Sequence, residues 1–551
     1  MVTTRIPAVR AAVEILGDEG ADQFFGSPGA TALPWYGALE KADGLGHLMA
    51  RHEQDAVHMA DGWARTSGRT GVVVAVPERS ERFERSGPGR GTGLGGLLDG
   101  LRAAWSDAVP LVCVTGRTVP PGRDDPTVPA AELVRSARPV TKCAVRVEDP
   151  TRIPQALRTA FRTAREGRPG PVLVYLPYGT ADHGIPYAAV ARPPVTTAPH
   201  PPDVAAVLNL LLAARRPLVL AGRGVRAAGA GAALRELVTY LGVPFQVTPR
   251  ARGCVGEDHE LYAGTAEVPD PRADFVLALG IGGETGGISA GGRTVVRVDA
   301  APRRADPDGD GRAAPGGSGT ALVCDLLLSL EALLAAAEER GAQADGGRWA
   351  ALTDHRPPTG GPLTACRVIT EAVAADGHAA HLVTDAVLYR LCGGPRRADH
   401  GARRYVACGR DGPPGRPVPA AIGVRMALDA QGHRDTAVVA LVRVHELRHV
   451  ADALAVAARH ELPFVLAAIG PGGRGGTEAL ELMRAYGCSA HRADDPDDLR
   501  SAAIWACKEA VTTARPVLLL ATARTTAEVH ATTPTQLLTA GVPRPRTPAE
   551  G

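Results

Sequence analysis

The sequence predicts an α/β protein made of three doubly wound domains, each with a parallel sheet that is covered by helices. Three observations lead to this prediction. The chain has 551 residues, which is more than one ordinary domain holds. Short apolar runs alternate with longer helical patterns along the whole chain, as buried parallel strands and their crossover helices do. Two stretches rich in Pro and Gly, residues 179–203 and 341–362, divide the chain.

These breaks give the domain boundaries that we expect. The first domain spans residues 1–180, the central domain 190–340 and the third domain 360–535, and each is of ordinary domain size. Each domain contains three apolar runs that are typical of strands buried on both faces. In chain order these runs are residues 71–76, 110–115, 171–176, 217–221, 275–279, 295–298, 437–442, 463–469 and 516–520.

Composition excludes several classes of protein. A hydrophobic content of 45% and a charged content of 22% are typical of a globular protein, and the net charge of +2 gives no reason to expect a nucleic-acid partner. No stretch approaches the ~18 uninterrupted apolar residues of a membrane span, and the N-terminus lacks the apolar core of a signal peptide. The 9 cysteines are scattered without a C-x-x-C pair, which argues against disulfides and structural zinc. We therefore expect a cytoplasmic protein with no membrane partner.

Several short motifs follow one another in a specific order. They are residues 25–30 (FGSPGA), 50–55 (ARHEQD), 58–65 (HMADGWAR), 86–89 (SGPG), 106–112 (SDAVPLV), 408–415 (CGRDGPPG) and 419–423 (PAAIG). In content and order they resemble the thiamine-diphosphate (ThDP) enzymes, in particular acetolactate synthase and glyoxylate carboligase. The resemblance covers nearly the whole chain. It implies a pyrimidine-binding first domain, a diphosphate-binding third domain, and carboligase or decarboxylase chemistry on 2-oxo acids.

Glu53 is the candidate catalytic residue. It stands where an extended segment turns into a helix with an apolar stripe. The resemblance implies that this glutamate hydrogen-bonds the aminopyrimidine ring of the cofactor and relays a proton. Burial would raise its carboxyl pKa toward the range that a relay needs. The structural alternative is a glutamate that is favoured at a helix start by the macrodipole. Glyoxylate carboligases usually lack this acid, so its presence favours the synthase side of the family.

The resemblance also implies which other residues surround the cofactor. In the first domain they are Gly26, Pro28, Gly29, Ser86 and Gly87, and in the third domain Gly409, Gly412 and Gly415. In acetolactate synthase-like proteins the central domain often carries FAD, and the Gly-containing turns at residues 221–224 and 279–283 are weak candidates for that site. The family forms its active sites between subunits, which implies a homodimer or homotetramer.

The third domain departs from the family where a magnesium ion should be held. The family places an aspartate and an asparagine at the ends of neighbouring strands, because a hard divalent cation needs oxygen ligands. In an ungapped comparison, Val444 falls on the aspartate and Pro471 on the asparagine. Neither side chain can bind magnesium, so we assign no metal-binding residue and expect no magnesium in the usual site. A charged insert, residues 77–85, would lie close to the pyrimidine site.

Two local alternatives remain open near Val444. Arg443, together with neighbouring basic residues, could hold a phosphate group without a metal at a helix N-terminus. Residues 445–449 also spell the H-E-x-x-H zinc pattern, although no third ligand follows at a familiar spacing.

A third alternative concerns assembly. A chain that keeps Glu53 but lacks the metal ligands could complete the active site of an intact paralogue in a hetero-oligomer. We therefore expect a ThDP-enzyme-like protein that lacks conventional magnesium–ThDP catalysis on its own. The alternatives are an active carbon–carbon lyase or ligase with an unusual diphosphate site and a half-site subunit.

Overall fold

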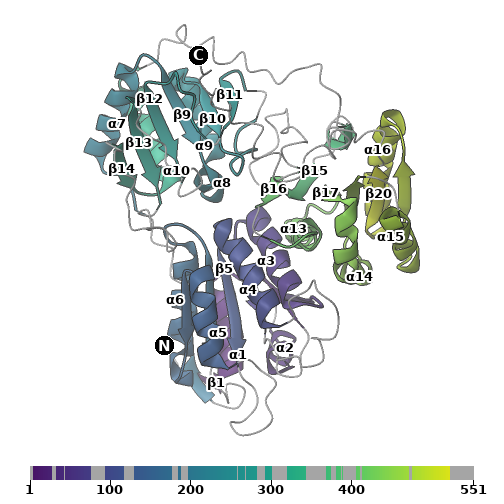
Figure 1. Cartoon of the computed structure of the whole chain (residues 1–551). Coiled ribbons are helices and arrows are strands. Elements are labelled where there is room, and N and C mark those ends of the chain that lie inside the picture. The colour runs from purple at the N-terminus through teal and green to yellow at the C-terminus, as the bar shows by residue number, and fades with distance from the viewer. Residues whose placement is uncertain are drawn as a thin grey trace, which may run out of the picture.

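The computed structural model contains three six-stranded sheets, each with all of its strands parallel (Figure 1). The structure is described for residues 4–27, 33–42, 44–75, 93–116, 129–176, 184–187, 197–256, 259–266, 268–281, 292–300, 319–342, 368–370, 372–373, 380–385, 388, 405–409, 412–470 and 474–521. The predicted fold class is confirmed.

The first domain has the strand order β3-β2-β4-β5-β7-β6. Its strands are β2 (Gln23–Gly26), β3 (Gly46–Met49), β4 (Gly71–Val74), β5 (Leu111–Gly116), β6 (Cys143–Arg146) and β7 (Pro171–Leu176). Its helices are α1 (Ala8–Asp18), α2 (Leu33–Leu39), α3 (Glu53–Ser67), α4 (Leu94–Ser106), α5 (Ala130–Ala137) and α6 (Ile153–Arg165), with short 3₁₀ turns η2 (Arg138–Val140) and η3 (Pro150–Arg152). Helices α1, α2 and α6 pack on one face of the sheet, and α3, α4 and α5 pack on the other.

The central domain has the strand order β11-β10-β9-β12-β13-β14. Its strands are β9 (Pro217–Ala221), β10 (Phe245–Val247), β11 (Tyr262–Thr265), β12 (Phe275–Leu279), β13 (Thr294–Asp299) and β14 (Gly319–Val323), and its helices are α7 (Pro201–Ala213), α8 (Arg223–Ala227), α9 (Gly231–Leu241) and α10 (Leu326–Glu339). The order reverses between β9 and β12, which is where ligands bind in open sheets of this type.

The third domain has the strand order β16-β15-β17-β18-β20-β19. Its strands are β15 (Ala380–Asp385), β16 (Tyr405–Cys408), β17 (Ala437–Arg443), β18 (Val465–Ile469), β19 (Ala490–Ala493) and β20 (Val517–Ala521). Its helices are α13 (Pro417–Ala430), α14 (Ala451–Arg459), α15 (Arg474–Ala485) and α16 (Pro496–Thr513), with the 3₁₀ helix η5 (Val444–His449) after β17. Taken in chain order within each domain, the first and third sheets share one strand order.

All nine predicted apolar runs are strands, within one or two residues at each end. A further two-stranded ribbon joins β1 (Thr4–Pro7) to β8 (Gly184–Tyr187) in antiparallel fashion. Strand β8 lies between the predicted first and central domains, so the first domain extends beyond residue 180. Among the described helices none is long and apolar enough to cross a membrane.

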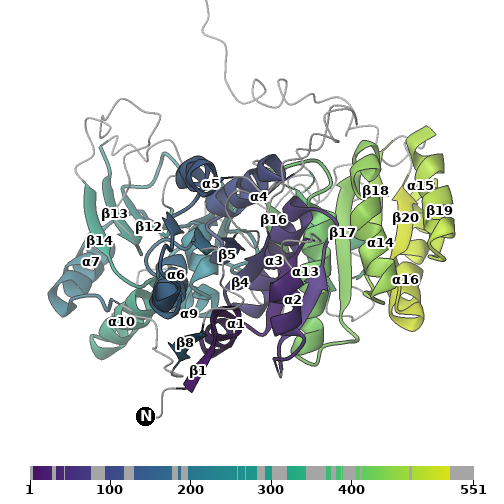
Figure 2. The ribbon, with the colours of Figure 1, turned by 90° about the horizontal axis from the view of Figure 1, so that it is seen from below.

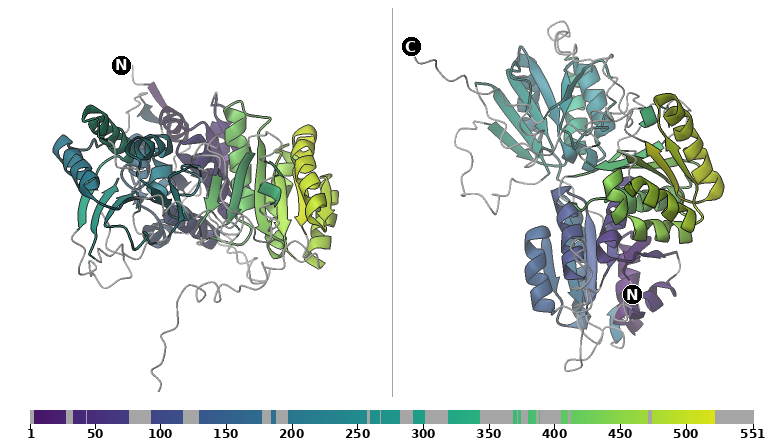
Figure 3. Two further views of the ribbon diagram at one scale, coloured as in Figure 1. Left: turned by 90° about the horizontal axis from the view of Figure 1, so that it is seen from above. Right: turned by 45° about the vertical axis from the view of Figure 1, so that its right-hand side comes forward.

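Helix α3 of the first domain packs directly on α13 of the third, and the two lie side by side in Figures 1 and 2. A Cβ on Gly62 would lie 2.0 Å from the Ala420 carbonyl oxygen, and one on Gly423 would lie 1.8 Å from the Met59 carbonyl oxygen. Glycine therefore allows the two helix backbones to touch. The central and third domains both lie at one end of the first domain (Figure 3, right).

Candidate functional site

Glu53 is the first residue of α3 and follows the extended residue His52. Its carboxylate accepts a hydrogen bond from the Ser27 hydroxyl at 3.2 Å, and the backbone N–H of Gly93, which precedes α4, lies close enough to lower its pKa. Burial raises the pKa of the Glu53 carboxyl above its ordinary value, although Ser27 and Gly93 act in the opposite direction. Burial therefore favours the protonated form of this carboxyl more than water does.

Gly26 and Tyr36 complete the surroundings of Ser27. The Tyr36 hydroxyl donates a hydrogen bond to the Ser27 carbonyl at 2.6 Å, and a Cβ on Gly26 would lie 2.3 Å from that hydroxyl. Burial and the nearby Glu53 raise the pKa of Tyr36 to about 12. The sequence did not single out Tyr36, because an aromatic residue in a helix has the pattern of an ordinary core residue.

Other predicted residues of this half of the site cannot be placed. Pro28, Gly29, Ser86 and Gly87 lie outside the described residues, as does the charged insert at residues 77–85. Their assignment to the cofactor stays a prediction.

The start of α3 contacts the third domain through His52. Its Nε2 lies 3.0 Å from Asp452 Oδ2 at the start of α14, and Arg51 lies 3.6 Å from the same carboxylate. These contacts hold the residue before Glu53 against the third domain.

The predicted metal positions lie at the carboxyl ends of neighbouring strands. Strands β17 and β18 are parallel, with Arg443 opposite Ile469. Val444 follows β17 and is 6% exposed, and a Cβ on Gly470, which follows β18, would lie 3.4 Å from the Val444 Cβ. Pro471 lies outside the described residues. At the carboxyl end of β17, Val444 thus presents an apolar side chain where a cation would need an oxygen ligand.

Arg443 is already paired within the third domain. Its guanidinium lies 2.5 Å from Glu446 Oε1 and 3.5 Å from Asp385, and its backbone N–H donates to Glu446 Oε2 at 3.1 Å. These carboxylates neutralise the charge that a phosphate would need, and the phosphate role of Arg443 stays a prediction.

The H-E-x-x-H segment does not take the form of a zinc helix. Residues 445–449 belong to the 3₁₀ helix η5, so the two histidines do not share one face as they would in an α-helix. Glu446 is held by Arg443. Within the described parts of the chain, no group of three or more His, Cys, Asp or Glu residues could hold a metal ion.

The loop before α13 lies at the opposite end of α4 from Glu53. The Gly409 N–H donates to Asp107 Oδ2 at 3.0 Å, and Asp107 follows α4 directly. A Cβ on Gly415, which has φ +82°, would lie 2.6 Å from Val450, and one on Gly412 would lie 2.9 Å from Arg416. Since α4 has 13 residues, it separates Gly409 from Glu53 by about 20 Å. The structure brings Glu53 together with Gly26 but not with Gly409.

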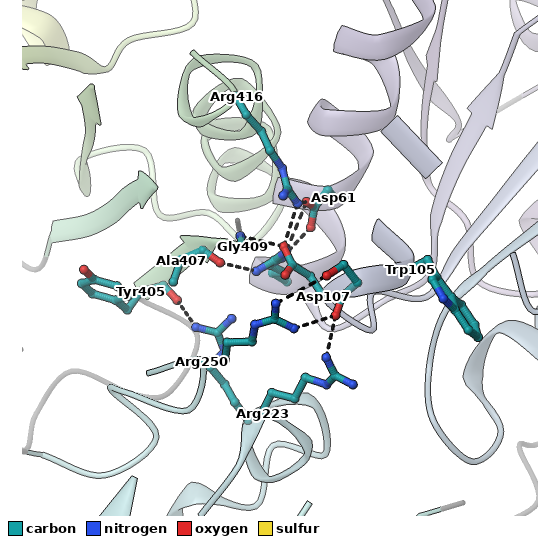
Figure 4. Close-up of polar contacts among 12 residues, drawn as sticks. Asp61, Trp105, Asp107, Arg223, Arg250, Tyr405, Ala407, Gly409 and Arg416 are labelled. Carbon is teal, nitrogen blue, oxygen red and sulfur yellow. Dashed lines mark hydrogen bonds and ion pairs between the residues drawn. The ribbon is translucent and has the colours of Figure 1, made fainter. Parts of the chain in front are cut away.

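Asp107 meets three other charged residues, and we call the four of them the junction cluster: Asp61, Arg65, Asp107 and Arg416 (Figure 4). Arg65 lies 2.5 Å from Asp61 and 2.7 Å from Asp107. Arg416 pairs with Asp61 and lies 2.9 Å from Asp107. Their side chains are 9% exposed or less. Two positive and two negative charges balance, which buried ions require.

The ion pairs dominate the titration of these acids. Burial alone would raise the pKa of Asp61, but Arg65 and Arg416 outweigh it and hold the pKa below its ordinary value. Asp107 behaves in the same way, with Arg416 and Arg65 as its main partners. His58 is 1% exposed, and neither ring nitrogen has a hydrogen-bond partner among the described residues. Its burial, with Arg416 nearby, lowers its pKa to about 3, so it is neutral at physiological pH.

Comparison with known proteins assigns the first and central domains. Residues 8–124 match the model described as "Thiamine pyrophosphate enzyme, N-terminal TPP binding domain", and residues 204–307 match "Thiamine pyrophosphate enzyme, central domain". The chain is 30% identical over 490 residues to glyoxylate carboligase of Escherichia coli O157:H7, covering 84% of this chain and 78% of that protein. The chain belongs to the ThDP-dependent carboligase and decarboxylase family.

Other members of the ThDP family match a shorter part of the chain or match it at lower identity. Acetolactate synthase isozyme 3 large subunit of E. coli strain K12 is 33% identical over 284 residues, which are 49% of this chain and 47% of that protein. Benzoylformate decarboxylase of Polynucleobacter necessarius has the same fold, with a TM-score of 0.73 at 18% identity over 94% of this chain and 99% of that chain.

The two halves of the chain fit ThDP unequally. The pyrimidine side fits, because a half-buried carboxyl with a raised pKa lies beside Ser27, which follows Gly26. The magnesium side does not fit, because Val444 offers no oxygen. The first domain thus offers a fitting acid, whereas Val444 in the third domain offers no oxygen ligand.

The glycines of the central domain have a packing role. A Cβ on Gly222 would lie 2.5 Å from the Gly280 carbonyl oxygen, and one on Gly224 would lie 2.6 Å from Gly280 Cα. Two turns of the backbone therefore touch each other at the point where the strand order reverses. This contact explains the glycines of the FAD candidate turns without a flavin; residues 282–283 lie outside the described part.

Proposed function

We propose that this chain is a ThDP-family protein that keeps the pyrimidine-side acid Glu53 but does not carry out conventional magnesium–ThDP catalysis on 2-oxo acids by itself. One observation carries the proposal: the buried, apolar Val444 occupies the carboxyl end of β17, next to Gly470 of the neighbouring strand. A cation that bridges two phosphates needs several oxygen ligands, and Val444 supplies none.

A turnover assay tests the proposal. Purified chain is supplied with ThDP, magnesium and glyoxylate or benzoylformate, the 2-oxo acids named by its relatives. We expect carbon dioxide release no faster than in the protein-free control, with E. coli glyoxylate carboligase as the positive control. Release that disappears in the Glu53→Gln variant would overturn the proposal and show that the chain is an active lyase or ligase with an unusual diphosphate site.

A second candidate function is that of a half-site subunit. Glu53 keeps its hydrogen bonds and raised pKa, and α4 places Gly409 about 20 Å away from it. An active site that contains both Glu53 and a residue such as Gly409 then requires a second chain, either another copy or an intact paralogue. The assembly we propose is a homodimer, a homotetramer or a hetero-oligomer with such a paralogue.

Complementation tests the half-site function. An intact paralogue is inactivated by changing its own matching glutamate to glutamine and is then mixed with this chain. If this chain supplies Glu53, turnover returns, and the matched control with Glu53→Gln in this chain stays inactive. Failure of the wild-type mixture to recover turnover, with complex formation shown by light scattering, would contradict it.

We infer no flavin in the central domain and a reducing, cytoplasmic location. Packing of Gly222, Gly224 and Gly280 supports the first inference. The seven described cysteines, none of which is in a disulfide, support the second. Absorbance near 450 nm in the purified protein would contradict the first inference, and a disulfide in protein taken from cells would contradict the second.

A further inference from the structure

Helices α3 and α4 form a parallel pair that joins Glu53 to the junction cluster. At one end the Gly93 N–H before α4 reaches Glu53. In the middle a Cβ on Gly100 would lie 2.8 Å from the Val57 Cβ, so the helices are in tight contact. At the other end Asp107 accepts from Arg65 of α3 at 2.7 Å. The contacts follow the same order along both helices, so the two run in the same direction.

All three domains meet at the far end of this pair (Figure 4). From the third domain, Arg416 and the Gly409 N–H both bond Asp107 Oδ2, and the Ala407 carbonyl accepts from Arg65 at 2.8 Å. From the central domain, Arg223 and Arg250 donate to the Ser106 carbonyl at 2.5 and 3.0 Å.

The arginines around the C-terminal end of α4 also stabilise the helix dipole. The C-terminal end of α4 carries the negative end of the helix dipole and carbonyls without intrahelical partners, which cations stabilise. Besides Arg223 and Arg250, Arg168 donates to the Trp105 carbonyl at 2.6 Å, and its guanidinium lies 4.4 Å from the centre of the Trp105 ring. Each domain thus contributes a guanidinium to residues 105–107.

We propose that Asp107 is a positioning residue: by tying α4 to the third and central domains it fixes the helix along its length and so holds the Gly93 N–H against Glu53. The inference concerns the same glutamate as the proposed function, but it does not require ThDP to bind. Its physical basis is that one carboxylate oxygen, Asp107 Oδ2, accepts from Arg65, Arg416 and Gly409 at 2.7 to 3.0 Å.

Amide hydrogen exchange on the full chain, without cofactor, tests this inference. Asp107→Asn removes the charge while keeping the size of the side chain. We expect exchange at the Gly93 and Leu97 amides to rise at least tenfold, together with exchange at Gly409. The Leu97 amide is informative because it reports the first turn of α4 through its bond to the Gly93 carbonyl at 3.1 Å.

Two further variants separate positioning from general destabilisation. Leu157→Ala makes a cavity in the core of the first domain on the opposite face of the sheet, and it should not raise exchange at Gly93 and Leu97 above the rest of the domain. Arg250→Ala removes one donor to the Ser106 carbonyl and replaces Asp107→Asn in the test if that variant does not fold. For Arg250→Ala we expect about a threefold rise in exchange at the Gly93 and Leu97 amides. Faster exchange confined to Gly409, or an equal rise with Leu157→Ala, would overturn the inference. Because no ThDP is present, neither result bears on the proposed function.

Discussion

The first and third domains share one strand order, yet the carboxyl ends of their sheets differ in chemistry. After β2 and β3 the first domain presents Ser27 and Glu53, which bond each other. After β17 the third domain presents Val444, which packs beside Gly470. A shared fold therefore does not preserve a site. The difference lies in single residues at strand ends, which can change without loss of the sheet.

The largest effect is expected at the junction cluster, where the two domains meet. Removing one acid from a buried ion pair leaves an uncompensated charge, so Asp107→Asn should lower the free energy of unfolding by about 3–5 kcal/mol at pH 7. Urea unfolding measures this change. The matched control is Arg69→Ala, which breaks an ion pair whose arginine side chain is 56% exposed and should cost about 1 kcal/mol or less.

The same cluster predicts a dependence on pH. The pKa values of Asp61 and Asp107 are lower in the folded chain than in the unfolded chain. The unfolded chain therefore takes up protons first, and stability is lost as the pH falls below about 4. Asp107→Asn should show a shallower loss over that range. An equally steep loss in the variant would mean that other acids dominate acid unfolding.

The next largest effect on stability is expected where α3 packs on α13. Gly62→Ala forces a Cβ against the Ala420 carbonyl and should cost about 1–3 kcal/mol through overpacking. Gly37→Ala, in α2 with nothing within 4 Å of the added Cβ, should be neutral or stabilise by up to about 1 kcal/mol. Thermal unfolding of both variants checks the contrast. Equal melting temperatures would show that the helices do not touch as described.

Introducing oxygen ligands at the two predicted metal positions should allow the third domain to bind magnesium together with ThDP. Val444→Asp combined with Pro471→Asn should increase ThDP affinity at least tenfold with magnesium, which corresponds to about 1.4 kcal/mol. Chelation with EDTA should abolish the gain, since the new oxygens act only through the ion. No gain, in a variant that stays folded, would contradict the assignment of Val444 to the aspartate position.

The smallest effect is expected at Glu53. Its pKa is raised in the folded chain, so folding favours the protonated form, and stability falls as the pH rises above about 4.5. Glu53→Gln should therefore stabilise the chain at pH 7 by about 0.5–1 kcal/mol, and the gain should vanish below pH 4. Glu14→Gln, at an exposed ion pair with Arg10, is the control and should change stability little.

Nine of the twelve inner strands that the structure describes could be predicted from the sequence, whereas β2, β10 and β15, the edge strands and the domain contacts could not. Strands such as β5 and β20 are buried on both faces and form continuous apolar runs. The edge strand β6 is half exposed and has no such pattern. Strand β8 lies in a Pro-rich stretch and is defined by its pairing with β1.

The candidate site could also be predicted only in part from the sequence. Glu53 and Gly26 stand in motifs whose order is specific. Asp61 and Asp107 also lie in quoted motifs, but their partner Arg416 is 355 residues away from Asp61 in the chain. A single sequence does not show which distant charges pair, so the junction cluster could be found only from the structure.

The central claim is that this chain has no functional magnesium site for the diphosphate of ThDP. Calorimetric titration of the purified chain with ThDP, with 5 equivalents or more of magnesium and then with EDTA in its place, tests it most directly. We predict the same weak binding, or none, under both conditions. Tight binding that requires magnesium would contradict the claim.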